Sequence, residues 1–124
     1  MTARWLNTDT GTGLLHARAR TPDRWDISVE RRWPVTGTLS RRRTAAQIRQ
    51  DIWRTAQRTR GFVPRVLVAL ENHHLQITGG GTMLTGRAGQ SLADHIADIL
   101  DNPDNRRRWA THARVKGGAC TAES

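Results

Sequence analysis

The spacing of apolar residues changes within a short stretch of the chain, from every second residue to every third or fourth. Trp25, Ile27, Val29 and Trp33 lie on one side of an alternating pattern that also includes Arg31, and this predicts a β-strand with one buried face. Ala45, Ile48, Ile52 and Ala56 recur at helical spacing, which predicts an amphipathic helix. A strand face and a helix face must be buried against each other, so we expect a mixed α+β fold.

Other segments extend this architecture. Residues 13–20 alternate loosely and precede the turn-forming Thr21-Pro22-Asp23, so we expect them to form a hairpin with the strand at 25–33. Residues 3–7 are expected to add a preceding strand. Residues 66–70 and 75–78 predict a second hairpin, which we expect Gly79-Gly80-Gly81 to end.

Three helices are expected. The first covers residues 44–58 and is stopped by Gly61. Ser91-Leu92-Ala93-Asp94 matches a capping box and predicts a second helix that ends near Asp101. Asn102-Pro103 predicts an N-cap followed by proline at the first position of a third helix, which continues through Ala113.

These elements predict a two-layer α+β sandwich, in which an antiparallel sheet from two hairpins carries two to three helices on one face. The length of 124 residues favours one domain. We place this domain at residues 1–115 and expect residues 116–124 to form a flexible C-terminal tail.

Positive charge is concentrated in one part of the sequence. The chain has a formal net charge of +9, and residues 31–65 contain ten arginines with one acid, Asp51, so the remainder is neutral overall. A local excess of this kind is typical of proteins that bind phosphates. We therefore expect a polyanionic partner.

The first predicted helix carries much of this charge. Long polar side chains recur on the face opposite its apolar stripe, at Arg43, Gln47, Gln50, Arg54 and Arg58. Guanidinium groups pair with phosphate oxygens through two parallel hydrogen bonds. We expect phosphate contacts from Arg41, Arg42, Arg43, Arg54 and Arg58, with Arg31, Arg32, Arg49 and Arg60 adding to the positive field. The alternative is a solvated helix face without a partner.

Tryptophans offer a second kind of contact. Trp25 and Trp33 flank Arg31 on one strand face, an arrangement also found in platforms that stack the bases of single strands. Because Ile27 and Val29 lie between the two rings, we favour core packing for this face. Trp53 and Trp109 lie beside apolar helix stripes and are predicted to be structural.

The sequence shows no recognisable catalytic motif. Gly81–Ala88 has the glycine spacing of a P-loop but lacks its lysine and its serine or threonine. Gly86-Arg87-Ala88-Gly89 is at most a secondary backbone contact, and His73 and His74 are interpreted as part of a polar turn. We expect a non-enzymatic protein with no cofactor and no metal site, the alternative being an active site that only the fold assembles.

The expected partner is nucleic acid, either DNA or RNA. The alternative is a small regulator or inhibitor, for example from a phage or another mobile element, whose basic face docks on an acidic protein surface or in a nucleic-acid-binding groove. Asp94, Asp98 and Asp101 form an acidic stripe that could orient the bound polymer or pair with a second copy in a homodimer. The chain has no apolar leader and no long apolar run, so we expect a cytoplasmic protein without a membrane partner.

Overall fold

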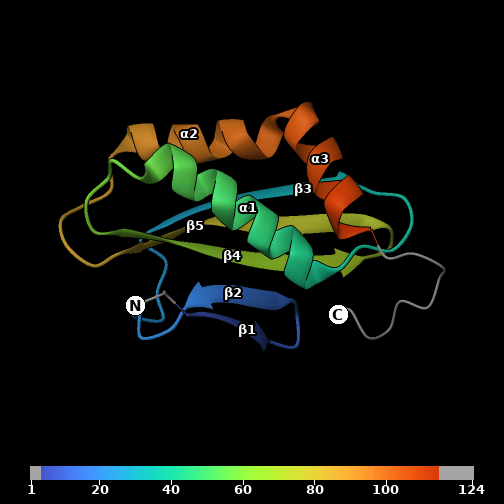
Figure 1. Ribbon diagram of the computed structural model, residues 1–124, viewed down its shortest axis with the longest axis horizontal. Helices are drawn as coiled ribbons and strands as arrows, with labels where there is room; N and C mark the ends of the chain where they lie inside the picture. Colours follow the sequence, from blue (N-terminus) through green and yellow to red (C-terminus); the bar gives the residue numbers. More distant parts are fainter. Residues whose placement is uncertain (1–3, 115–124) are drawn as a thin grey trace.

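The computed structural model describes residues 4–114, which form a five-stranded antiparallel sheet with three helices on one face (Figure 1). This confirms the predicted two-layer α+β sandwich. The predicted tail at 116–124 lies outside the described residues. The elements in chain order are β1 (Trp5–Asp9), β2 (Leu14–Arg18), β3 (Ile27–Pro34), α1 (Arg41–Ala56), β4 (Phe62–Glu71), β5 (His74–Met83), α2 (Gln90–Asp101) and α3 (Pro103–Ala113).

The strand order is β1-β2-β4-β5-β3, and every neighbouring pair is antiparallel. The additional N-terminal strand is confirmed as β1, which pairs with β2. The hairpin of β4 and β5 is also confirmed. Its two-residue turn consists of Asn72 and His73, with φ values of 51° and 61°, and positive φ at both positions is typical of the type I′ turns that suit the twist of a hairpin.

The predicted hairpin between residues 13–20 and 25–33 is wrong. β2 pairs with β4, whereas β3 lies at the opposite edge of the sheet and pairs with β5. The connection between them is held to the central strands: the Arg65 guanidinium donates to the Pro22 carbonyl at 3.1 Å, and the Thr82 hydroxyl donates to the Arg24 carbonyl at 2.8 Å. These long-range contacts override the local turn chemistry.

The prediction that Gly79-Gly80-Gly81 ends the second hairpin is also wrong, because all three residues lie within β5. A Cβ added at Gly79 would lie 3.3 Å from Ile52 Cδ1 and 3.4 Å from Leu100 Cδ1. A Cβ at Gly80 would lie 2.0 Å from the Ile27 carbonyl oxygen. The glycines therefore let the helices and β3 approach the strand closely.

The predicted helices agree with the structure more closely than the predicted strands do. Helix α1 begins at Arg41, three residues earlier than expected, because Ser40 is its N-cap and accepts a hydrogen bond from the Arg43 amide. The predicted capping box that begins at Ser91 is wrong, since the N-cap of α2 is Gly89. Asn102 is confirmed as the N-cap of α3, where its side chain accepts from the amides of Asp104 and Asn105.

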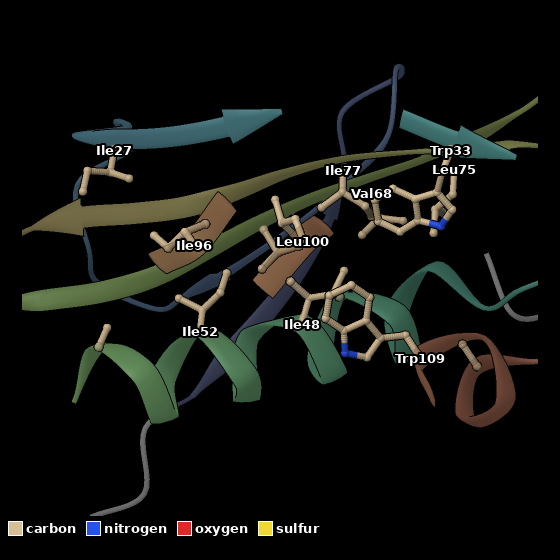
Figure 2. Close-up of a cluster of buried hydrophobic side chains, with 14 of the residues drawn as sticks. Ile27, Trp33, Ile48, Ile52, Val68, Leu75, Ile77, Ile96, Leu100 and Trp109 are labelled. Carbon is tan, nitrogen blue, oxygen red and sulfur yellow. The ribbon is translucent and has the colours of Figure 1, made fainter. Parts of the chain in front are cut away.

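One hydrophobic core fills the space between the two layers (Figure 2). Ile48 and Ile52 from α1, Ile96 and Leu100 from α2, and Trp109 from α3 are all essentially fully buried. They face a sheet surface formed by residues that include Ile27, Trp33, Val68, Leu75 and Ile77. The predicted apolar stripes of the helices are therefore confirmed.

The core interpretation of the β3 face is confirmed at its two ends. Ile27 is buried, and Trp33 is only 8% exposed and packs against Trp109 with 6.3 Å between the ring centroids. Trp25 lies just before β3, with the Arg65 guanidinium 5.3 Å from its ring centroid. This face is therefore not an open stacking platform.

The β1–β2 hairpin lies at the edge of the sheet farthest from α2 (Figure 1). Among the described residues, the core cluster contains none from β1 or β2. Alternation places Trp5, Asn7 and Asp9 of β1 on the same face as His16 and Arg18 of β2, because these residues pair across the strands. This is the helix-bearing face, since His16 also pairs with the core residue Val66.

Candidate nucleic-acid interface

A groove follows the boundary between α1 and the β1–β2 hairpin. It consists of three hollows of about 480, 350 and 250 Å³. The hollow of 480 Å³ shares Asn7 and Arg42 with that of 350 Å³, and Trp5 with that of 250 Å³. We call this surface the arginine groove after its cationic residues, which are Arg4, Arg18, Arg41, Arg42, Arg43 and Arg49. Four of these arginines come from the start and the middle of α1, and Arg4 and Arg18 lie outside the charged stretch of residues 31–65.

One side of α1 forms a wall of the groove. Arg42, Ala46, Arg49 and Trp53 line its hollows, and their spacing places them in one row along the helix. From Arg41, which also lines the groove, to Trp53, this wall spans about 18 Å at the helical rise of about 1.5 Å per residue. The row lies beside the buried stripe of Ile48 and Ile52, so the packing of α1 on the sheet also fixes the groove.

A chain of hydrogen bonds crosses the middle of the groove. Arg49 Nε donates to His16 Nε2 at 3.0 Å, and His16 Nδ1 lies 2.7 Å from Asn7 Oδ1. Because arginine can only donate, His16 Nε2 must accept, and the neutral ring then carries its proton on Nδ1 and donates it to Asn7. This chain orients the Arg49 guanidinium, whose central carbon lies 4.3 Å from the Trp5 ring centroid.

Burial makes His16 a poor base. The side chain is shielded from solvent and lies beside the Arg49 charge, and these two effects lower the pKa of His16 from 6.5 to about 4. Burial also lowers the pKa of Arg49, which nevertheless stays charged at neutral pH. The groove therefore holds a fixed cation next to a neutral imidazole.

We expect this arrangement to make the protein less stable in acid. Between pH 6.5 and pH 4 the unfolded chain binds a proton at His16 while the folded protein does not, so the free energy of unfolding should fall by up to about 1.4 kcal/mol per pH unit. Urea unfolding of the wild type and of His16→Gln across this pH range measures the effect. The free energy of unfolding of the variant should fall less steeply with decreasing pH than that of the wild type. His95→Gln, which changes an exposed histidine of α2, is the matched control. Equal slopes for wild type and His16→Gln would contradict the assignment.

One acidic residue, Asp9, lines the groove among the residues that the structure describes. Asp9 Oδ2 lies 3.5 Å from Arg41 Nη2, and Asp9 Oδ1 accepts a hydrogen bond from the Gly11 amide at 2.8 Å. The Gly11 hydrogen bond and the Arg41 charge lower the pKa of Asp9. Asp9 is therefore ionised at neutral pH beside Arg41, and the described residues of the groove carry more positive than negative charge.

The structure distributes the predicted phosphate-binding arginines over several surfaces. Arg41, Arg42, Arg43 and Arg49 line the groove. Arg54, Arg58 and Arg60 are exposed but line none of its hollows, and Arg54 lies 3.7 Å from Asp51. Arg32 alternates with the core-facing residues of β3 and is exposed on the face of the sheet without helices.

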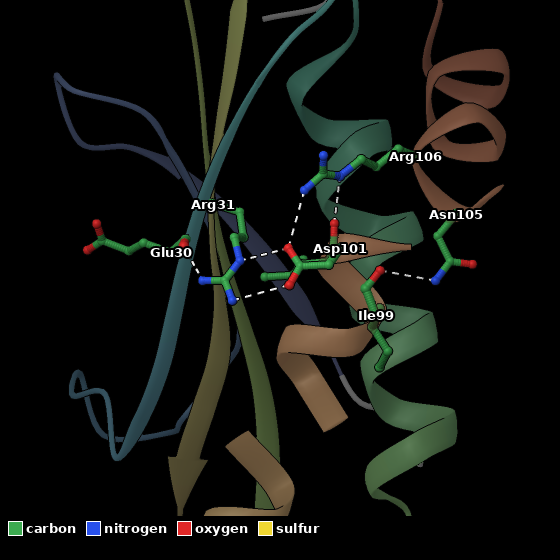
Figure 3. Close-up of polar contacts among 7 residues, drawn as sticks. Glu30, Arg31, Ile99, Asp101, Asn105 and Arg106 are labelled. Atoms are coloured by element: carbon green, nitrogen blue, oxygen red, sulfur yellow. Dashed lines mark hydrogen bonds and ion pairs between the residues drawn. The ribbon is translucent and has the colours of Figure 1, made fainter. Parts of the chain in front are cut away.

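Arg31 is held by an ion pair (Figure 3). Its Nε and Nη2 atoms donate to the two carboxylate oxygens of Asp101 at 2.7 and 3.3 Å, and Arg106 Nη2 lies 3.4 Å from the same carboxylate. Hydrogen bonding from Arg31 lowers the pKa of Asp101 and raises that of Arg31. One end of the predicted acidic stripe thus ties β3 to α2 and α3.

Sequence reasoning missed six residues of the groove, which are Arg4, Trp5, Asn7, His16, Arg18 and Trp53. The alternation of Trp5, Asn7, His16 and Arg18 was visible, but only the pairing of β2 with β4 places the β1–β2 hairpin beside α1. The prediction that Trp53 is structural is wrong, since this side chain is 49% exposed, whereas Trp109 is 1% exposed as expected. The spacing of Arg42, Arg49 and Trp53 on one helical face could have indicated this surface.

The comparisons with known proteins add no assignment. No protein family, curated protein or solved structure matches this chain. Residues 4–114 contain no group of three or more histidine, cysteine or acidic side chains placed to hold a metal ion. Within the same residues, no helix has the length and apolar character needed to cross a membrane.

Proposed function

We propose that this protein binds nucleic acid through the arginine groove, without catalysing a reaction. The observation that supports the proposal is the convergence of six arginines from β2, α1 and the residue before β1 on one concave surface, which has a single acid among its described lining residues. Their number is more than solubility requires, and bidentate pairing with phosphate oxygens is the ordinary use of clustered guanidinium groups.

The dimensions of the groove limit the number of phosphates. About 18 Å of helix corresponds to roughly five phosphates at the spacing of about 3.4 Å per strand in a duplex. Five neutralised phosphates give an expected slope of about −4.5 in a plot of log affinity against log salt for a duplex, and of about −3.5 for a single strand that makes the same number of contacts.

A salt titration tests the proposal. Protein freed of contaminating nucleic acid is titrated into fluorescent DNA and RNA oligonucleotides of about 20 nucleotides, between about 25 and 200 mM salt. The double substitution of Arg18 and Arg42 by Ala should reduce the magnitude of the slope by about 1.4, because two phosphate contacts are lost. Arg32→Ala, which removes an exposed charge on the other face of the sheet, is the control and should leave the slope unchanged.

Two results would contradict the proposal. One is the absence of binding to every DNA and RNA probe at the lowest salt concentration. The other is an equal effect of Arg32→Ala and of each groove substitution, which would show attraction by net charge alone. If nucleic acid does not bind but an acidic protein does so through Arg42, the groove serves the alternative function of a protein-binding regulator.

A further inference from the structure

The smallest hollow of the arginine groove differs in chemistry from the other two. It has a volume of about 250 Å³ and is lined by Trp5, Arg18, Arg49, Trp53, Val63 and Pro64. Pockets for drug-sized ligands usually span about 300–1,000 Å³, so this one suits a single planar group. Two indoles, two guanidinium groups and an apolar floor make it suitable for a group that is aromatic and attached to an anion.

Trp53 is the exposed aromatic side chain of this hollow. It leaves 49% of its surface in solvent, whereas Trp33 and Trp109 are 8% and 1% exposed in the core. Exposing a tryptophan forgoes the burial of a large apolar surface, and such side chains are frequent anchors in binding sites. Since Trp53 is four residues after Arg49 on α1, its ring and the guanidinium are neighbours along the same side of the helix.

Arg49 has no acidic partner in the part of the chain that the structure describes. Its Nε donates a hydrogen bond to His16 Nε2, and its Nη atoms donate none to any described residue. The buried or half-buried arginines elsewhere are paired with carboxylates, as Arg65 is with Asp23 and Arg106 with Asp101. A half-buried cation that is oriented but unpaired is suited to an anionic ligand.

We propose that this hollow receives a base of single-stranded nucleic acid, which stacks on Trp53 while Arg49 and Arg18 contact the adjacent phosphate. The inference rests on the proposed nucleic-acid function and specifies its substrate class. A base in a duplex is stacked between its neighbours and cannot present its flat face to an indole, whereas an unpaired base can. The groove therefore selects single strands over duplexes.

The test compares ligands of equal charge. Wild-type protein is titrated with an oligonucleotide of deoxythymidine, one of uridine, a duplex, and a strand of the same length that carries abasic sites throughout. We expect both base-containing single strands to bind at least about tenfold more tightly than the duplex and the abasic strand.

Variants locate the effect at Trp53. Trp53→Ala should weaken binding of the single strands by about 5- to 100-fold and leave the duplex and abasic affinities within about twofold, because only base stacking is removed. Trp53→Phe should retain most of the affinity but lose the part of the tryptophan fluorescence quenching that arises from Trp53, while Trp5 of the same hollow remains. Leu84→Ala removes another exposed apolar side chain and is the control.

The outcomes separate this inference from the function on which it rests. If no nucleic acid binds, the proposed function itself fails. If nucleic acid binds in a salt-dependent way, but duplex and single strand bind equally or Trp53→Ala changes both alike, the function stands and the base-stacking site is overturned. Circular dichroism and thermal unfolding of each variant confirm that it is folded, which the exposure of Trp53 leads us to expect.

Discussion

Gly80→Ala is expected to lower the free energy of unfolding by about 3 kcal/mol or more. The added Cβ would lie 2.0 Å from the Ile27 carbonyl oxygen and 3.0 Å from Ser28 Cα. Both atoms belong to the backbone of β3, so the strand itself must move away from β5. Forcing extra atoms into a packed site commonly costs about 1–3 kcal/mol, and displacement of a paired strand places this substitution at or above the upper end.

Urea unfolding followed by circular dichroism measures this loss. Gly89→Ala is the matched control, because a Cβ at Gly89 meets nothing within 4 Å, and its expected cost is below about 1 kcal/mol. Since a domain of this size has about 5–15 kcal/mol of stability in total, the Gly80 variant should be partly unfolded well below the transition of the wild type. Equal stabilities of the two variants would contradict the close approach of β3 to β5.

Asp51→Ala is expected to cost about 3 kcal/mol of stability. Asp51 Oδ2 accepts hydrogen bonds from Trp109 Nε1 at 2.7 Å and from Arg108 Nη2 at 2.5 Å, and its side chain is 8% exposed. Removing the carboxylate leaves the buried indole N–H without an acceptor and Arg108 without its counter-charge. Breaking a buried pair costs about 3–5 kcal/mol, and the lower value applies because the Arg108 side chain remains 37% exposed.

Two further variants make the Asp51 measurement specific. Asp51→Asn retains an oxygen acceptor for Trp109, so it should lose less stability than Asp51→Ala. Asp104→Ala breaks the exposed ion pair with Arg107 and should cost about 1 kcal/mol or less. Asp51 is the only acid between residues 31 and 65, and its burial means that it does little to neutralise the groove. If Asp51→Ala and Asp104→Ala lose the same stability, the hydrogen bonds that Asp51 of α1 accepts from Arg108 and Trp109 of α3 stabilise the fold no more than an exposed ion pair does.

The sequence predicted the elements whose causes are local. The apolar spacing of Ile48 and Ile52 identified the buried side of α1, and Asn102 followed by Pro103 identified the start of α3. The β4–β5 hairpin was also predicted, because its strands are adjacent in the chain. In each case the decisive interaction joins residues that are close in sequence.

The errors concern contacts between distant residues. Whether Thr21-Pro22-Asp23 closes a hairpin depends on Arg65 and Thr82, which bind the connection to the middle of the sheet. Gly79–81 would break a strand by propensity alone, but here they allow close packing with Ile27 and Ile52. The predicted site had the same weakness. Arg49 was named, yet its partners Trp5 and His16 belong to a hairpin whose position only the sheet order determines.

The peripheral position of the β1–β2 hairpin separates recognition from folding. In the described part of the chain, none of its side chains belongs to the core cluster, while Trp5, Asn7, His16 and Arg18 all line the groove. Substitutions at Trp5, Asn7 or Arg18 should therefore change what the groove accepts with little effect on the rest of the sheet. Such a surface can diversify during evolution under weaker constraint than α1, which contributes residues to both the core and the groove.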